Sequence, residues 1–302
     1  MPIVNTPYLI LTRSRSGSNM FKDYLNSHPQ IKSMAELCRT NEGLDIEATI
    51  KKVYDQPGDI DASGFKLFYY HPNDGSPSEI WDRLKEISNL KTISLRRNPL
   101  RCSVSSVIMR QSKQHKQEVG EDVVPIEEKR IEVDVNRFLN QIEHIESLRR
   151  QLNDKLDSEP YEVWYEDIVA DGQTVMDGVF QHLGLDANPI KTNLQKQNPE
   201  GIHELISNYD ELRDAVMNRG LFDSIDMGHH WREVLNEEQA DRIMTDKRGL
   251  DVLERLRYLL KLQQSCVEQR EEVLRHHLSR REYRHIRRRL MHQKRRQRRR
   301  RS

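Results

Sequence analysis

Short apolar runs alternate along the chain with longer stretches in which apolar residues recur every three or four positions. The runs have the length and composition of buried strands. They predict strands over residues 8–11, 62–70, 90–95 and 161–168. The periodic stretches are typical of helices that pack one face against a sheet. They predict a first helix from Met20 to about Asn26, a long helix over residues 134–156, and another that ends near residues 180–185.

The alternation of strands and helices indicates an α/β domain, in which helices cover a central sheet. A chain of 302 residues has the length of one catalytic domain with an extension. Residues 113–131 are polar and show no clear period, so we expect a loop or lid there. From Leu235 onward apolar residues again recur at helical spacing, which predicts a helical extension.

The turn between the first strand and the first helix is rich in hydrogen-bond donors. It contains Arg15, Ser16, Gly17, Ser18 and Asn19. A strand, a small-residue turn and a helix together aim backbone N–H groups at an anion. The arginine adds a fixed positive charge, and the hydroxyl and amide groups add further donors. The turn is therefore predicted to hold a phosphate, and the alternative is a serine-rich turn that binds no ligand.

This turn has one glycine and lacks the lysine of the nucleoside-triphosphate loop. It resembles instead the 5′-phosphosulfate loop of sulfotransferases, which take their sulfuryl group from 3′-phosphoadenylyl sulfate (PAPS). With the segment over residues 25–31, it looks most like the carbohydrate and glycolipid sulfotransferases. The resemblance implies that residues 15–19 bind the phosphosulfate and that Arg15 also stabilises the departing phosphate.

A second motif follows the predicted strand over residues 90–95. There Arg97, Asn98 and Pro99 are followed by Ser105, eight residues after the arginine. The motif resembles the sulfotransferase segment that holds the 3′-phosphate of PAPS, which implies this role for Arg97 and Ser105. The residue types suit the role, because a guanidinium forks onto phosphate oxygens and a hydroxyl adds another donor.

Three further residues receive roles from the resemblance. Glu36 matches a glutamate that serves as general base, Tyr165 a residue beside the adenine, and Lys196 a contact to the donor. A base is needed because a sugar hydroxyl is a poor nucleophile until its proton is withdrawn during attack. The alternatives are that Glu36 is an ordinary surface residue, that Tyr165 simply packs in the core and that Lys196 is an ordinary loop residue. Lys66 could also face the donor or acceptor, although a strand-end lysine in water is commoner.

The resemblance covers roughly residues 5–245. It implies an α/β, P-loop-like three-layer domain with a central, mainly parallel sheet of four or five strands and PAPS at their carboxyl ends. We therefore expect a sulfotransferase domain over residues 1–245 and a helical extension with a basic tail over residues 246–302. No metal is expected, because His229 and His230 have no third ligand at suitable spacing. The expected reaction is in-line transfer from PAPS to a hydroxyl of a carbohydrate or glycolipid.

The net charge of +1 is unevenly distributed along the chain. Residues 275–302 contain 14 Lys and Arg and one acidic residue, whereas the rest of the chain contains 35 basic and 47 acidic residues. Such a tail is typical of segments that bind polyanions or an anionic surface. No apolar run reaches the length of a membrane span, and the three scattered cysteines form no disulfide or zinc pattern. We therefore expect a cytoplasmic enzyme.

Two other classes of function fit parts of the chain. A P-loop-like kinase would need the missing lysine, and turnover of ATP that PAPS does not affect would favour it. A nucleic-acid- or polyanion-binding protein would depend on the basic tail. Salt-sensitive binding of RNA or DNA without affinity for PAPS would favour that second class.

Overall fold

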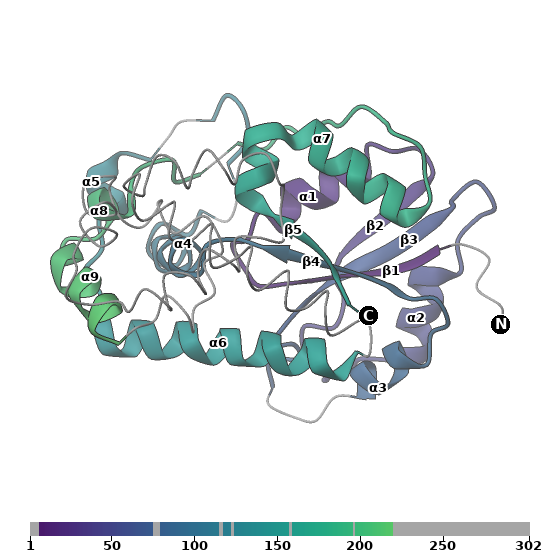
Figure 1. Ribbon diagram of the computed structural model, residues 1–302, viewed down its shortest axis with the longest axis horizontal. Coiled ribbons are helices and arrows are strands. Elements are labelled where there is room, and N and C mark those ends of the chain that lie inside the picture. Colours follow the sequence, from purple (N-terminus) through teal and green to yellow (C-terminus); the bar gives the residue numbers. More distant parts are fainter. Residues whose placement is uncertain are drawn as a thin grey trace, which may run out of the picture. The chain divides into compact units, whose positions relative to one another are not determined.

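The computed structural model in Figure 1 describes residues 6–74, 79–114, 117–121, 124–156, 159–195 and 197–219. The predicted domain boundary at residue 245 and the helical extension with its basic tail lie outside the described residues. Lys196, His229 and His230 also lie outside them.

Among the described residues, five strands form one sheet in which every neighbouring pair is parallel. In sheet order they are β2 (Ile31–Glu36), β3 (Ala62–Phe68), β1 (Thr6–Thr12), β4 (Lys91–Arg96) and β5 (Tyr161–Trp164). The central strand β1 is almost entirely buried. This topology confirms the predicted α/β class and the parallel central sheet.

Helices cover both faces of the sheet (Figure 1). On one face, α1 (Ser18–Leu25) and α7 (Tyr165–Leu183) share a core with Tyr8 and Ile10 of β1. On the other face, α2 (Ile46–Tyr54), α3 (Glu79–Lys85) and α6 (Val135–Lys155) share a core with Leu9 and Leu11. Because side chains alternate along a strand, β1 contributes to both cores and the three-layer arrangement follows.

The remaining described helices, α4 (Pro99–Ser112), α5 (Ile126–Lys129), α8 (Ile202–Leu205) and α9 (Tyr209–Asn218), pack with one another and with α6 (Figure 1). α4 begins directly after β4. Its first turn is capped by Asn98, whose side chain accepts hydrogen bonds from Leu100 N at 3.0 Å and Arg101 N at 3.2 Å. Pro99 occupies the first helical position, where its missing N–H costs nothing. This start directs α4 across the carboxyl end of β4.

β1 and β4 lie within two residues of their predicted ranges, whereas β2, β3 and β5 differ in ways that have a physical reason. The sequence did not predict β2, an edge strand in which buried Ile31 and Ser33 flank exposed Lys32 and whose apolar content is low. β3 ends at Phe68 rather than at residue 70, and all its residues are buried because other strands flank it and helices cover both faces. β5 stops at Trp164, because α7 begins at the next residue.

Gly64 lies where β3 passes close to β1. A Cβ atom at this position would lie 2.3 Å from the carbonyl oxygen of Tyr8 and 2.5 Å from its ring. The two residues are register partners, and both are buried at the centre of the sheet. A side chain at position 64 would therefore push apart the two central strands.

We expect Gly64→Ala to lower the free energy of unfolding by about 1–3 kcal/mol or more, because overpacking forces the backbone to shift. Gly58→Ala is the matched control, since nothing lies within 4 Å of the added Cβ atom. Its effect should stay within about 0.5 kcal/mol. Urea unfolding of both variants measures the difference, and equal losses would contradict the close approach of β1 and β3.

Candidate active site

The loop between β1 and α1 forms a tight turn at the carboxyl edge of the sheet. Arg15 and Gly17 adopt left-handed backbone conformations, with φ angles of 65° and 84°. A Cβ atom added at Gly17 would also lie only 2.3 Å from a carbon atom of the Tyr165 ring, so glycine suits this position. The turn places Ser18 at the first position of α1, where the backbone N–H groups have no partner within the helix.

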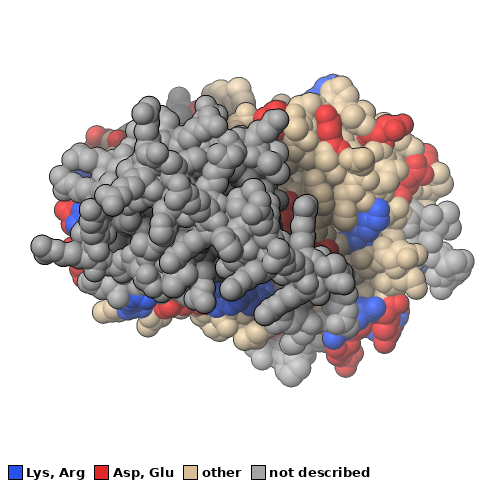
Figure 2. Space-filling model, in the orientation of Figure 1, with Lys and Arg blue, Asp and Glu red and all other residues tan. Residues whose placement is uncertain are grey.

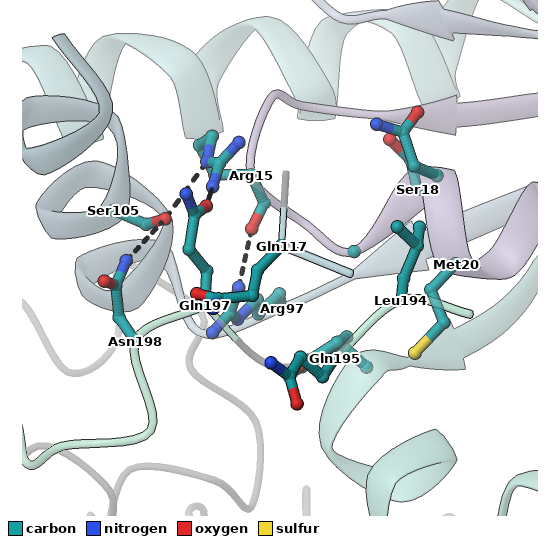
Figure 3. Close-up of a pocket in the computed structure, with 13 residues that line it drawn as sticks. Arg15, Ser18, Met20, Arg97, Ser105, Gln117, Leu194, Gln195, Gln197 and Asn198 are labelled. Carbon is teal, nitrogen blue, oxygen red and sulfur yellow. Dashed lines mark hydrogen bonds between the residues drawn. The ribbon is translucent and has the colours of Figure 1, made fainter. Parts of the chain in front are cut away.

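A pocket opens beside this turn (Figure 3). It collects predicted site residues from three separate parts of the chain: Arg15, Gly17, Ser18 and Asn19, then Arg97 and Ser105, and finally Tyr165. The carboxyl ends of parallel strands lie at one edge of a sheet, so loops that are distant in sequence meet there. The two motifs that the sequence separates by about 80 residues thus line the same pocket.

Two arginines and a serine form a polar cluster in this pocket (Figure 3). Arg15 Nε donates to Ser105 Oγ at 3.0 Å, and Arg97 Nη1 donates to the carbonyl oxygen of Arg15 at 2.8 Å. The Arg97 guanidinium lies 4.2 Å from the centroid of the Tyr165 ring. Burial, and then the positive charge of Arg97, lower the pKa of Arg15. Two guanidinium groups held this close favour an anionic ligand.

Ser16 has a different environment from its neighbours in the turn. Its side chain is buried, and its hydroxyl is hydrogen-bonded to Thr12 Oγ1 at 2.7 Å. Thr12 Oγ1 also lies 2.7 Å from the carbonyl oxygen of Leu95 in β4. The Ser16 side chain therefore anchors the turn to the sheet, and it is not among the side chains that line the pocket.

Two loops that are distant in sequence join at the side of the pocket. Glu118 and Leu194 form an antiparallel bridge, and Gln195 N donates to the carbonyl oxygen of Gln117 at 3.1 Å. The side chains of Gln117, Leu194 and Gln195 line the pocket. Much of residues 113–131 is loop, as predicted, and the one helix described within it is the short α5.

The second of these loops reaches the polar cluster. Gln197 Oε1 accepts a hydrogen bond from Arg15, and Asn198 Nδ2 donates to Ser105 Oγ at 3.2 Å. The buried Lys129 ammonium supports the loop by donating to the carbonyl oxygen of Gln197 at 3.2 Å. The resemblance included this segment but gave a role to Lys196 alone, and polar loop residues such as Gln197 and Asn198 carry no periodic signal of their own.

Glu36 lies at the carboxyl end of β2 and is not among the residues that line the pocket. Its Oε1 atom pairs with Lys66 Nζ at 3.0 Å. Lys66 also lies 2.6 Å from Asn19 Oδ1 and 3.4 Å from Ser18 Oγ. Only 2% of Lys66 is exposed, so the interpretation of a strand-end lysine in water is wrong. One buried lysine thus connects Glu36 with the loop that begins α1.

Neither a metal site nor a membrane-spanning helix occurs among the described residues. In this part of the chain, no group of three or more His, Cys, Asp or Glu side chains has the arrangement of a metal site. None of the described helices is both long and apolar enough to span a membrane. The described site consists of arginine, lysine, hydroxyl, amide and carboxylate groups around a helix N-terminus.

A turn of this geometry at the carboxyl edge of a parallel sheet is typical of α/β proteins that bind phosphate groups. A family model described as "Sulfotransferase domain" matches residues 5–248, which is most of the chain. The chain belongs to this family and is a PAPS-dependent sulfotransferase.

Solved structures of two bacterial proteins are similar to this chain. A sulfotransferase from Alicyclobacillus acidocaldarius is 14% identical, with a TM-score of 0.48, over 75% of this chain and 98% of its own. The sulfotransferase domain of the olefin synthase from Synechococcus PCC 7002 is 19% identical, with a TM-score of 0.37, over 62% of this chain and 77% of its own. A comparison with curated proteins finds no match.

His71 lies close to Glu36 and is buried. Its ring packs against Phe68 at a centroid distance of 4.7 Å. Burial lowers the pKa of His71 to about 4; Glu36 opposes this shift, whereas Arg39 and Lys66 add to it. The folded protein therefore keeps this imidazole neutral at a pH where an exposed histidine takes up a proton.

We expect His71 to make the protein less stable as the pH falls from about 6.5 to about 4, because the unfolded chain binds a proton that the folded chain does not. The loss should reach up to about 3 kcal/mol. Urea unfolding of wild type and His71→Gln at about pH 7 and about pH 4.5 measures it, since only wild type carries this titration. Equal pH dependence in the two proteins would contradict a neutral buried His71.

Proposed function

We propose that the enzyme moves a sulfuryl group from PAPS to a hydroxyl of a carbohydrate or glycolipid. The observation that carries this proposal is the cluster of Arg15, Arg97 and Ser105 beside the N-terminus of α1. PAPS has two phosphate groups at opposite ends of its ribose, so it needs two anion sites side by side. The turn that begins α1 and the Arg97 cluster have the chemistry of such a pair.

In this proposal, Arg97 and Ser105 bind the 3′-phosphate, and residues 15–19 bind the phosphosulfate. The hydrogen bond from Arg15 to Ser105 supports a shared role for Arg15, whose guanidinium would border both sites. Ser16 would contribute through its backbone, because its hydroxyl is used within the turn. Tyr165 would contact the adenosine while its ring supports Arg97, and Lys196 is a further proposed contact to the donor.

Glu36 is the proposed general base of the transfer. The acceptor oxygen attacks sulfur, the bond from sulfur to the 5′-phosphate oxygen breaks, and the hydroxyl proton passes to the carboxylate. The products are the sulfated acceptor and 3′,5′-adenosine diphosphate (PAP), so no protein nucleophile takes part. Sulfuryl transfer, like phosphoryl transfer, depends on alignment and on stabilisation of developing charge. The link from Glu36 through Lys66 to Ser18 supports a base beside the donor.

The proposed acceptor class rests on the likeness of the turn at residues 15–19 and of residues 25–31 to carbohydrate and glycolipid sulfotransferases. Incubation with sulfur-labelled PAPS and an extract of host glycans and glycolipids tests it, with the labelled product identified by mass spectrometry. We expect sulfate esters on sugar hydroxyls. Label on proteins or phenols alone would overturn the acceptor class, and turnover of ATP without use of PAPS would favour a kinase.

The acidic body and the basic tail suggest where the enzyme acts. We place it in the cytoplasm, where residues 275–302 would hold it at an anionic surface or polyanion. Salt-sensitive binding to anionic vesicles that persists after deletion of these residues would overturn the role of the tail. The truncated protein should still use PAPS, because the donor-site residues precede the tail.

Arg97→Ala should weaken PAP binding by about 10- to 150-fold, the effect of losing a charge-assisted hydrogen bond, and change AMP binding far less. AMP lacks the 3′-phosphate, so the difference isolates that group. Arg96→Ala is the matched control, since Arg96 stacks on Trp164 and pairs with Glu162 instead. Calorimetry that gives equal losses for PAP and AMP in Arg97→Ala would exclude Arg97 from the 3′-phosphate site.

Glu36→Gln should lower turnover by about 10²–10⁴-fold and leave PAP affinity nearly unchanged. The substitution keeps the size of the side chain and an oxygen for Lys66, but removes the proton acceptor. Glu162→Gln, a carboxylate on the surface of β5, is the control and should retain turnover. If Glu36→Gln retained turnover but lost PAP, the carboxylate would serve structure and not proton transfer.

A further inference from the structure

Lys129, the last residue of α5, carries its charge inside the protein. Its side chain is 1% exposed, whereas the lysine and arginine side chains drawn blue in Figure 2 reach the surface. Removing an ammonium group from water costs free energy unless hydrogen bonds and an opposite charge compensate. Lys129 is not among the side chains that line the pocket, so direct contact with a ligand there does not explain the buried charge.

The ammonium group of Lys129 contacts two oxygen atoms of one short segment, residues 197–200. Its Nζ atom lies 2.8 Å from Glu200 Oε1 and 3.2 Å from the carbonyl oxygen of Gln197. Arg101 of α4 also donates to the carbonyl oxygen of Glu200. Hydrogen bonds from a charged group are shorter and stronger than neutral ones. Lys129 therefore holds the segment at two points, one on the backbone and one on a side chain.

The same segment contacts both motifs of the proposed PAPS site (Figure 3). Gln197 Oε1 accepts a hydrogen bond from Arg15, and Asn198 Nδ2 donates to Ser105 Oγ at 3.2 Å. The backbone of Gln197 is thus fixed by Lys129, while its side chain reaches Arg15. One residue lies between the buried ammonium group and a guanidinium group of the pocket.

The connection between the two chain segments does not itself require a buried lysine. Ile131 N donates to the carbonyl oxygen of Leu205 at 2.8 Å, and Ser207 N donates to the carbonyl oxygen of Ile131 at 2.8 Å. These backbone hydrogen bonds already join the residues after α5 to the end of α8. An apolar pair of similar volume is often at least as stabilising as a buried ion pair. The contact of Lys129 with the Gln197 carbonyl group is what an apolar side chain could not provide.

We propose that Lys129 is a positioning residue of the PAPS site, which acts through Gln197 and Asn198 on the binding of the 3′-phosphate. By holding their segment, it keeps the two amide side chains against Arg15 and Ser105. The inference rests on the proposed function, in which Ser105 binds the 3′-phosphate and Arg15 borders it. It gives α5 a part in PAPS binding, although Lys129 itself does not line the pocket.

Loss of the ammonium group would affect the pocket in two steps. The Gln197 carbonyl group would lose this hydrogen bond, and the Glu200 carboxylate would keep a largely buried charge without its cation. Residues 197–200 would then shift to bring that carboxylate closer to water. The amide groups would move with their backbone, and the Arg15 guanidinium and the Ser105 hydroxyl would lose the contacts that direct them.

The test compares Lys129→Met, which removes the charge and keeps the length, with wild type. We expect PAP binding to weaken by about 10-fold, the lower end of the effect of losing a charge-assisted hydrogen bond, and AMP binding to change by less than about threefold. Arg149→Met is the matched control, since it breaks another buried ion pair, with Glu146, outside the pocket. It should lower stability and keep PAP affinity within about threefold of wild type.

A double variant separates positioning from stability, and it gives the answer even if Lys129→Met does not fold. Lys129→Met with Glu200→Met removes both charges, so urea unfolding should return close to that of wild type. PAP binding should remain about 10-fold weaker, because the Gln197 carbonyl group still lacks its charged partner. If PAP affinity returned together with stability, the ion pair would serve the fold alone and the inference would be wrong.

A second background tests whether the effect passes through the two amides. In a protein with Gln197→Ala and Asn198→Ala, adding Lys129→Met should cost less than about threefold in PAP affinity, since residues that act through one another are not additive. A full 10-fold loss in that background, or equal losses of PAP and AMP affinity in Lys129→Met alone, would overturn the inference. Wild type that bound PAP no more tightly than AMP would instead overturn the proposed function on which it rests.

Discussion

Every described strand of the sheet runs in the same direction, and this constraint determines where the site lies. The carboxyl ends of β1, β2, β3 and β4 meet at one edge, so the loops that follow them meet as well. Four parts of the site come together there without any long excursion of the chain. They are the turn after β1, the carboxylate at the end of β2, the lysine of β3 and the arginine after β4. An antiparallel strand at any of these positions would deliver its last residue to the opposite edge.

Positively charged side chains gather at the carboxyl edge of the sheet, although removing their charges from water costs free energy. Lys66 is buried, Arg15 and Arg97 are half-buried, and burial lowers the pKa of both Arg15 and Lys66. Each cation is held by oxygen atoms of the protein: Ser105 for Arg15, the carbonyl oxygen of Arg15 for Arg97, and Glu36 for Lys66. These contacts fix the directions of the cations in the folded protein, and preorganised charges of this kind need little reorganisation when an anion develops beside them.

Residues that carry strong local signals were predictable from the sequence. The continuous apolar runs of β1 and β4 predicted strands of the sheet, and the two motifs around Gly17 and Arg97 selected residues that line one pocket. β2 was not predicted, because an exposed edge strand needs few apolar residues. The pairing of Glu36 with Lys66 depends on a register shift between two strands, and no local pattern within either segment encodes it.

A crystal structure of the protein with PAP tests the central claim most directly, because it locates both phosphate groups at once. We predict the 3′-phosphate within hydrogen-bond distance of Arg97 and Ser105, and the 5′-phosphate at the backbone N–H groups of the turn before α1. PAP bound in the reverse orientation, or at a site away from this turn, would contradict the account.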